Sequence, residues 1–231
     1  MESDPGERAI ASVPASRALV WYGDAIRLWK RGPATFAVLA GLTVFAQLAL
    51  EMVPDAGALA AKVVVPLVAC GMLYGAAAAE AGLRPRLLHA ISAFRAPAAA
   101  IAAIVLSSAI TFGAEWLAAD ALAGVNLLRP GATPADLDVA TVLGIYATGI
   151  AVSLPMTFVP LAALFGEAGL AGSFAVSASA FARNPGAFLL YGAIALALLS
   201  LGLVTMGIGL VIALPLIACA TFVAWRDLCT R

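Results

Sequence analysis

Five polar side chains inside apolar stretches are the first candidates for chemistry. They are Gln47, Ser107, Ser108, Ser153 and Thr157. A hydroxyl group in a membrane helix usually bonds to the carbonyl one turn earlier or to a neighbouring helix, and neither role needs catalysis. If the helices that carry these groups leave a space between them, the same five groups would line a polar cavity suited to a solute. The sequence leaves both interpretations open.

Nucleophiles and metal ligands are few. His89 is the single histidine, and the cysteines, Cys70, Cys219 and Cys229, form no CxxC pair. A zinc or haem site needs more ligands than these, and a hydrolase needs a nucleophile beside a base, or paired carboxylates. We therefore expect no metal, no cofactor and no enzymatic activity. We expect His89 to be solvated or lipid-facing, and the cysteines to be small core residues.

Three arginines each stand two residues before a proline, in Arg31-Gly32-Pro33, Arg95-Ala96-Pro97 and Arg183-Asn184-Pro185. Proline at the first helical position presets φ and costs no hydrogen bond, so each triplet predicts the start of a helix. The free N–H groups of that helix end and the guanidinium would point at the same anion. Arg31, Arg95 and Arg183 are thus candidate ligands for anionic lipid headgroups. Ordinary anchoring at the membrane surface is the alternative.

The amino-acid composition indicates the medium in which these side chains lie. The chain has 231 residues, of which 63% are apolar and only 11% are charged, whereas a soluble domain carries about 25% charged residues. A globule of this length could not bury so much apolar surface in water, so we expect it to lie in a lipid bilayer. Its net charge of zero provides no basic face for nucleic acid.

Six apolar runs are long enough to cross a hydrocarbon layer of about 30 Å. They cover Ala34–Val53, about Leu59–Ala79, Pro97 to about Trp116, Val139–Phe165, Pro185–Val204 and, after a turn at 205–207, a run to Trp225. In this register Gln47 is the deepest strongly polar side chain. The ionisable residues at or near span ends are Glu51, Lys62, Glu80, Glu115 and Glu167. Leu117–Asp138 is the one long polar loop, and Pro155 and Pro160 either kink or break the fourth span.

Three amphipathic segments, at 15–31, 86–95 and 167–182, precede the three pairs of spans. Their apolar positions are Ala18, Trp21, Tyr22, Ala25, Leu28 and Trp29; then Leu87, Leu88, Ile91 and Phe94; then Leu170, Phe174 and Phe181. They are too polar to span, so we expect helices lying in the headgroup plane. For the first, packing against protein is the alternative. Residues 1–14 are predicted to be a frayed tail without a signal peptide.

These parts recur, which predicts one membrane domain over residues 1–231 built from three helix-pair repeats, about 15–80, 85–165 and 167–228. Each repeat consists of an amphipathic helix, an Arg-x-Pro triplet, a span, a turn and a second span. The second span carries Pro-Leu-x-Ala at 66–69, 160–163 or 215–218. The fold class is therefore an all-α polytopic membrane protein with six transmembrane helices. The glycines at 71 and 75 fit either packing within the chain or dimerisation.

Basic residues are distributed unequally between the two sides that six spans define. One side would hold Arg8, Arg17, Arg27, Lys30, Arg31, Arg84, Arg86, Arg95, Arg183, Arg226 and Arg231, and the other only Lys62 and Arg129. Positive charge accumulates on the cytoplasmic side of membrane proteins. The sequence therefore predicts that both termini are cytoplasmic.

Several stretches resemble a known group of proteins. They are 75–82, Leu88-His89-Ala90-Ile91-Ser92-Ala93-Phe94-Arg95, the run 177–192 that contains Arg183-Asn184-Pro185, 214–219, and Trp225-Arg226-Asp227-Leu228. These resemble uncharacterised bacterial inner-membrane proteins, a group distantly similar to YciC-type proteins and to the membrane domain of some glycerophosphodiester phosphodiesterases. The resemblance implies a six-span protein of the bacterial inner membrane and no settled activity. The phosphodiesterase domain has no counterpart here, so its chemistry does not carry over.

Two functions from different classes fit these features. A scaffold, accessory subunit or lipid-organising protein would work through its bilayer-embedded surfaces, with anionic lipids, another membrane protein or a second copy of the chain as partners. A transporter or channel for a small solute or lipid would need a solvent-reachable cavity lined by the five polar residues. The sequence favours the scaffold or lipid-organising role. A solvent-reachable cavity in the structure would favour transport.

Overall fold

The computed structural model describes residues 10–53, 56–127, 137–166 and 168–229. Throughout these ranges the regular structure is helical, with no strand. Six helical stretches are long and apolar enough to cross a membrane. The predicted all-α class and its six spans are therefore confirmed.

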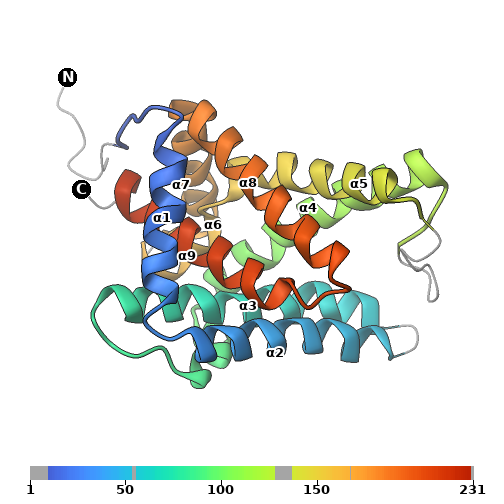
Figure 1. Ribbon diagram of the computed structural model, residues 1–231, viewed down its shortest axis with the longest axis horizontal. Helices are drawn as coiled ribbons and strands as arrows, with labels where there is room; N and C mark the ends of the chain where they lie inside the picture. The colour runs from blue at the N-terminus through green and yellow to red at the C-terminus, as the bar shows by residue number, and fades with distance from the viewer. Residues whose placement is uncertain (1–9, 54–55, 128–136, 167, 230–231) are drawn as a thin grey trace.

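The spans form three hairpins (Figure 1). Helix α2 (Pro33–Glu51) pairs with α3 (Gly57–Glu80), α4 (Ala98–Ala123) with α5 (Val139–Ser153), and α8 (Pro185–Val204) with α9 (Leu210–Cys229). The shorter elements α1 (Arg17–Trp29), η1 (Leu87–Arg95) and α7 (Leu170–Arg183) each precede a hairpin. Each span-opening proline lies at or next to a helix start, at Pro33, Pro97 and Pro185.

The two ends of the bundle differ. We call the end with α1, η1 and α7 the basic end, on the left of Figure 1, and the end where the hairpins turn the turn end, on the right. The described basic residues of the basic end are Arg17, Arg27, Lys30, Arg31, Arg84, Arg86, Arg95, Arg183 and Arg226. Lys62, in α3, lies towards the turn end, and Arg129 lies outside the described residues.

The fourth span is broken rather than kinked. Helix α5 gives way to a 3-10 turn, η3 (Leu154–Met156), and the chain resumes as α6 (Val159–Phe165). Pro155 and Pro160 have no N–H to give to the carbonyl one turn earlier. The buried N–H of Phe158 is donated instead to Oγ of Ser177 in α7, at 3.0 Å. The matching prolines, Pro66 and Pro215, lie inside continuous helices.

The third span is longer than the sequence indicated, so the prediction of a loop from Leu117 is wrong for its first seven residues. Helix α4 continues to Ala123 and ends at Gly124, whose φ of 65° is the left-handed conformation typical of a helix end. The alanines and leucines of 117–123 are strong helix formers, and the single Asp120 is exposed and does not interrupt them.

The core is concentrated at the basic end. The ring of Phe158 lies 5.2 Å from that of Phe188 and 5.6 Å from that of Trp225, all with edge-to-face geometry. Trp21 of α1 packs on Phe188 and donates its indole N–H to Asp227, at 3.1 Å. The aromatic face of α1 is thus buried against α8 and α9. The first amphipathic segment therefore packs against protein, and the expectation that its aromatic face contacts lipid headgroups is wrong.

The start of the described chain is also held in place. The N–H of Ala11 donates to the carbonyl of Leu228 at 3.0 Å, and that of Val13 to Oδ1 of the buried Asn184 at 2.7 Å. The prediction of a frayed tail is therefore wrong for residues 10–14, because Asn184 supplies a buried acceptor. Residues 1–9 lie outside the described part.

Element η1 exposes its large apolar residues and packs on α3 through its backbone. The exposed residues are Leu87, Leu88, Ile91 and Phe94. A Cβ on Gly71 would lie 2.7 Å from Cα of Ala90, and one on Gly75 would lie 3.0 Å from the ring of Phe36. Both glycines are therefore used for close approach within the chain.

Helix α7 differs from its predicted amphipathic pattern. It buries Ser173, Ser177 and Ala180, whereas Leu170, one of the three predicted anchors, is 39% exposed. Phe181 is partly buried beside Phe188. Small residues allow α7 to lie close to the break in the fourth span.

Candidate functional site

A cavity of about 520 Å³ lies between the three hairpins, a size typical of small-molecule sites. Its wall is contributed by α2, α3, α4, α5, η3, α6, α8 and α9. All five polar residues singled out in the sequence line it. They are Gln47 from α2, Ser107 and Ser108 from α4, Ser153 from α5, and Thr157 from the break.

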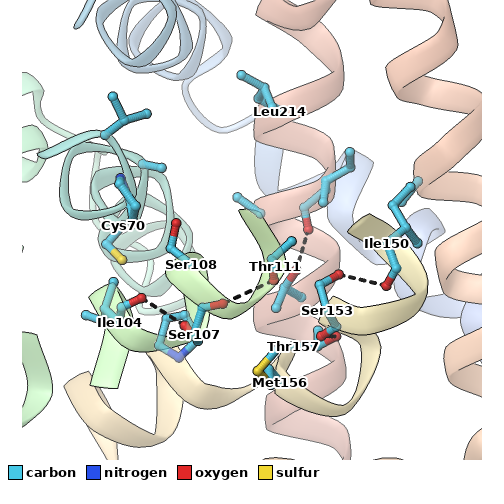
Figure 2. Close-up of a pocket in the computed structure, with 18 of the residues that line it drawn as sticks. Cys70, Ile104, Ser107, Ser108, Thr111, Ile150, Ser153, Met156, Thr157 and Leu214 are labelled. Atoms are coloured by element: carbon cyan, nitrogen blue, oxygen red, sulfur yellow. Dashed lines mark hydrogen bonds between the residues drawn. The ribbon is translucent and has the colours of Figure 1, made fainter. Parts of the chain in front are cut away.

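Most hydroxyls of the cavity donate to their own helix (Figure 2). Ser107 donates to the carbonyl of Ile104, Ser153 to that of Ile150 and Thr157 to that of Leu154, each at 2.9 Å. Their oxygens can still accept from a ligand. Within the described residues Ser108 has no hydrogen-bond partner, so its hydroxyl can both donate and accept.

Two charged side chains complete the wall, and the sequence register had placed both at or near span ends. Lys62 lies five residues after the start of α3, with Nζ 4.1 Å from the ring centroid of Phe112. Glu115 lies eight residues before the end of α4, which is about 12 Å of helix. The expectation for Glu115 is wrong because α4 extends past Trp116 to Ala123. The run of helix formers after Trp116 was the available signal.

Glu115 also replaces Gln47 as the deepest strongly polar side chain near the turn end. Gln47 is four residues from the end of α2 and donates its amide to Glu51 on the same helix. Glu115 is half-buried and lies directly over the backbone of Gly149 in α5. A Cβ on Gly149 would come within 2.8 Å of Cγ and Cδ of Glu115, so the side chain lies against the glycine backbone and would shift if residue 149 carried a Cβ.

The floor of the cavity faces the basic end. Tyr191 of α8 and Thr221 of α9 share a hydrogen bond of 2.7 Å, and both line the cavity. The hydroxyl of Tyr22 in α1 donates to the carbonyl of Tyr191 at 3.2 Å, and the two rings stack. About one turn nearer the basic end, Phe188 and Trp225 belong to the packed aromatic core. The cavity is therefore closed on this side.

The three arginines lie away from the cavity, each at the start of a different hairpin. All are exposed. Arg31 donates to the carbonyl of Ala79 at the end of α3, and Arg183 donates to that of Ile10 at 3.3 Å. Arg95 ends η1 beside the exposed Phe94.

The remaining chemical candidates have structural roles. His89 is half-buried, and its Nδ1 accepts the N–H of Arg86 at 3.3 Å. Burial, with a smaller contribution from the charge of Arg86, lowers the pKa of His89. Cys70, Cys219 and Cys229 are buried free thiols. In the described part of the chain no three His, Cys, Asp or Glu residues group as a metal site would require.

Six helical stretches able to span, one of them broken beside a mostly apolar cavity with a few hydroxyl groups, define a multi-pass integral membrane protein. No family model matches the chain, and neither curated proteins nor solved structures give a significant match. The resemblance to YciC-type proteins therefore stays a prediction from the sequence.

Proposed function

We propose that the protein is a carrier that binds a small, mostly apolar solute with a polar group in the cavity and moves it across the bacterial inner membrane. The observation that carries this proposal is the cavity itself, with its ring of hydroxyls at the broken span. Discontinuous helices beside a site near the membrane centre are a recurring feature of carriers. Apolar walls with a few placed polar groups are typical of small-molecule sites.

The cavity favours transport over the scaffold or lipid-organising role that the sequence first favoured. A scaffold would need a partner-covered surface, whereas a hydroxyl-lined space between spans has a direct use in solute binding. The proposed carrier has no catalytic role. The hydroxyls of Ser107 and Ser153 have helix carbonyls as partners, and such bonds do not activate a nucleophile.

We propose that the basic end faces the cytoplasm, as the distribution of Arg and Lys favours. The cavity would then be closed towards the cytoplasm by Tyr191 and Thr221 and would be reached from the outside. In the same orientation Arg31, Arg95 and Arg183 lie among the inner headgroups. Arg95, next to the exposed apolar residues of η1, is the best placed of the three to contact an anionic lipid.

Cysteine labelling from outside the cell tests access to the cavity. In a background with the native cysteines replaced by alanine, we compare Ser108→Cys with Ala109→Cys, the exposed neighbour on the lipid side of α4. A charged methanethiosulfonate reagent needs a hydrated thiolate. We expect Ser108→Cys to react at least about tenfold faster than Ala109→Cys. Equal rates, or no reaction at Ser108→Cys, would refute the proposal.

Mass spectrometry of protein purified in mild detergent tests occupancy. Ser108→Phe places a ring in the cavity, and Ala109→Phe places the same ring in the lipid. We expect a co-purified small molecule to be lost from the first variant and retained by the second. Thermal unfolding of both variants shows whether the bundle still folds.

A further inference from the structure

Among the described residues, Lys62 and Glu115 are the two charged side chains in the cavity wall, and their placement has a chemical consequence. The ammonium lies over Phe112, one turn before Glu115 on α4, so the charge of Lys62 acts on the carboxylate. No ion pair within 4.0 Å joins the two in the described part of the chain. Each is therefore left with capacity for another partner.

Other charged and titratable groups do not compensate for this pair. Four elements pack on α4: α3, α5, α6 and α7. From α3 the facing group is Lys62, and from α5 it is Tyr146, which interacts with Glu115. Helix α6 has no ionisable residue, and α7 has only Arg183, at the basic end. On α4 itself, Asp120 is exposed beyond Glu115, nearer the turn end.

The charge of the site therefore depends on one proton. With Glu115 ionised, the wall carries one positive and one negative charge and is neutral overall. With Glu115 protonated, Lys62 is left as an unbalanced cation on a mostly apolar wall, which favours the binding of an anion beside it. A bound monoanion restores neutrality. Proton and anion should consequently each favour the binding of the other.

We infer that Glu115 binds a proton together with an organic monoanion held by Lys62, so that the carrier moves the two species as a neutral pair. This rests on the proposed function and names its substrate class as an amphipathic molecule with one acidic group. One proton from the outside water joins the carboxylate, and one anion enters beside the ammonium. Both leave on the other side, so no net charge crosses the membrane. The hydroxyl of Ser108, on the same wall of α4, can donate to the anion.

The proton site can be tested without knowing the natural substrate. Dicyclohexylcarbodiimide is an apolar reagent that reacts with protonated carboxyl groups in membranes, and its adduct is located by peptide mass spectrometry. We expect an adduct on Glu115 that is about tenfold more abundant at low pH than at high pH. Glu115→Gln should abolish this adduct. Glu51→Gln, at the exposed end of α2, should leave it unchanged. Absence of an adduct on Glu115, or a yield independent of pH, would overturn the inference.

The coupling to an anion is tested with octanoate as the probe and octanol as its uncharged counterpart. We expect octanoate to raise the midpoint pH of Glu115 labelling by about one unit, which is a tenfold linkage. Octanol should have no effect, and Lys62→Gln should remove the effect of octanoate. A midpoint that does not respond to octanoate, or that still responds in Lys62→Gln, would show that proton and anion are not coupled here.

These results are separable from those on the cavity. If Ser108→Cys is labelled while Glu115 never reacts, the carrier proposal stands and proton coupling fails. If Ser108→Cys is not labelled, the carrier proposal fails, and with it the inference that rests on it.

Discussion

The three hairpins meet around an aromatic core at the basic end, and the α4–α5 hairpin diverges from the α2–α3 hairpin towards the turn end (Figure 1). At the basic end, aromatic rings from the fourth span, α8, α9 and α1 interlock around Phe158. Asp227 is buried there and accepts from Arg17 at 2.7 Å and from Trp21 at 3.1 Å. Towards the turn end, the corresponding space between hairpins holds the hydroxyl-lined cavity.

This contrast indicates that one end of the bundle stabilises the fold and the other end provides the binding cavity. Large buried aromatic rings and buried hydrogen bonds hold the hairpins together at the basic end. The other end then does not need to be packed for the fold to persist. The break in the fourth span lies at the boundary, with Phe158 in the core and Thr157 in the cavity wall. Two consecutive residues thus belong to the part that stabilises and to the part that binds.

The strongest test of this division compares two phenylalanines. Phe158→Ala should destabilise the protein by about 3–5 kcal/mol, since it removes a fully buried ring from the aromatic core. Phe112→Ala, in the half-buried wall of the cavity, should cost about 1 kcal/mol, because the ring already borders an open space. Thermal or denaturant unfolding in detergent measures both. Equal losses would contradict the contrast between the two ends.

A smaller effect is expected from two serines. Ser177→Ala leaves the buried N–H of Phe158 without its acceptor, which should cost about 1–3 kcal/mol. Ser108→Ala removes a hydroxyl that has no partner in the described chain, so its cost should stay below about 0.5 kcal/mol. The same unfolding measurement applies. A loss at Ser108 as large as that at Ser177 would mean that Ser108 has a structural role.

Much of this arrangement follows from local sequence, and the rest depends on tertiary contacts. Apolar length and the Arg-x-Pro triplets predicted six spans and their starts, because both are properties of single segments. The break at Pro160 was left open, because Pro66 and Pro215 show that the same motif can continue a helix. The fourth span differs in its second proline, Pro155, and in the hydroxyl of Ser177, nineteen residues after Phe158, which accepts the N–H of Phe158.

The candidate site also depends on tertiary contacts that the local sequence does not predict. The five polar residues could be listed from the sequence, but whether they meet depends on how the hairpins separate. Glu115 was misplaced by an error in one helix end. Its fit against Gly149 joins two helices and has no signature in either alone. The glycine at 149 is informative only once the carboxylate is known to lie over it.

The smallest effect should be confined to the edge of the basic end, where pH acts on His89. In the folded protein burial lowers the pKa of this imidazole below its unfolded value of about 6.5. Its contribution to stability is therefore present above that value and is lost as the pH falls through the lowered folded pKa. Protonation of Nδ1 removes the acceptor for the N–H of Arg86. Hydrogen exchange of the 86–89 peptide, corrected for intrinsic rates, should accelerate at low pH in the natural protein but not in His89→Asn, which keeps an acceptor without titrating. Equal acceleration in α1 would show instead that the whole basic end loosens.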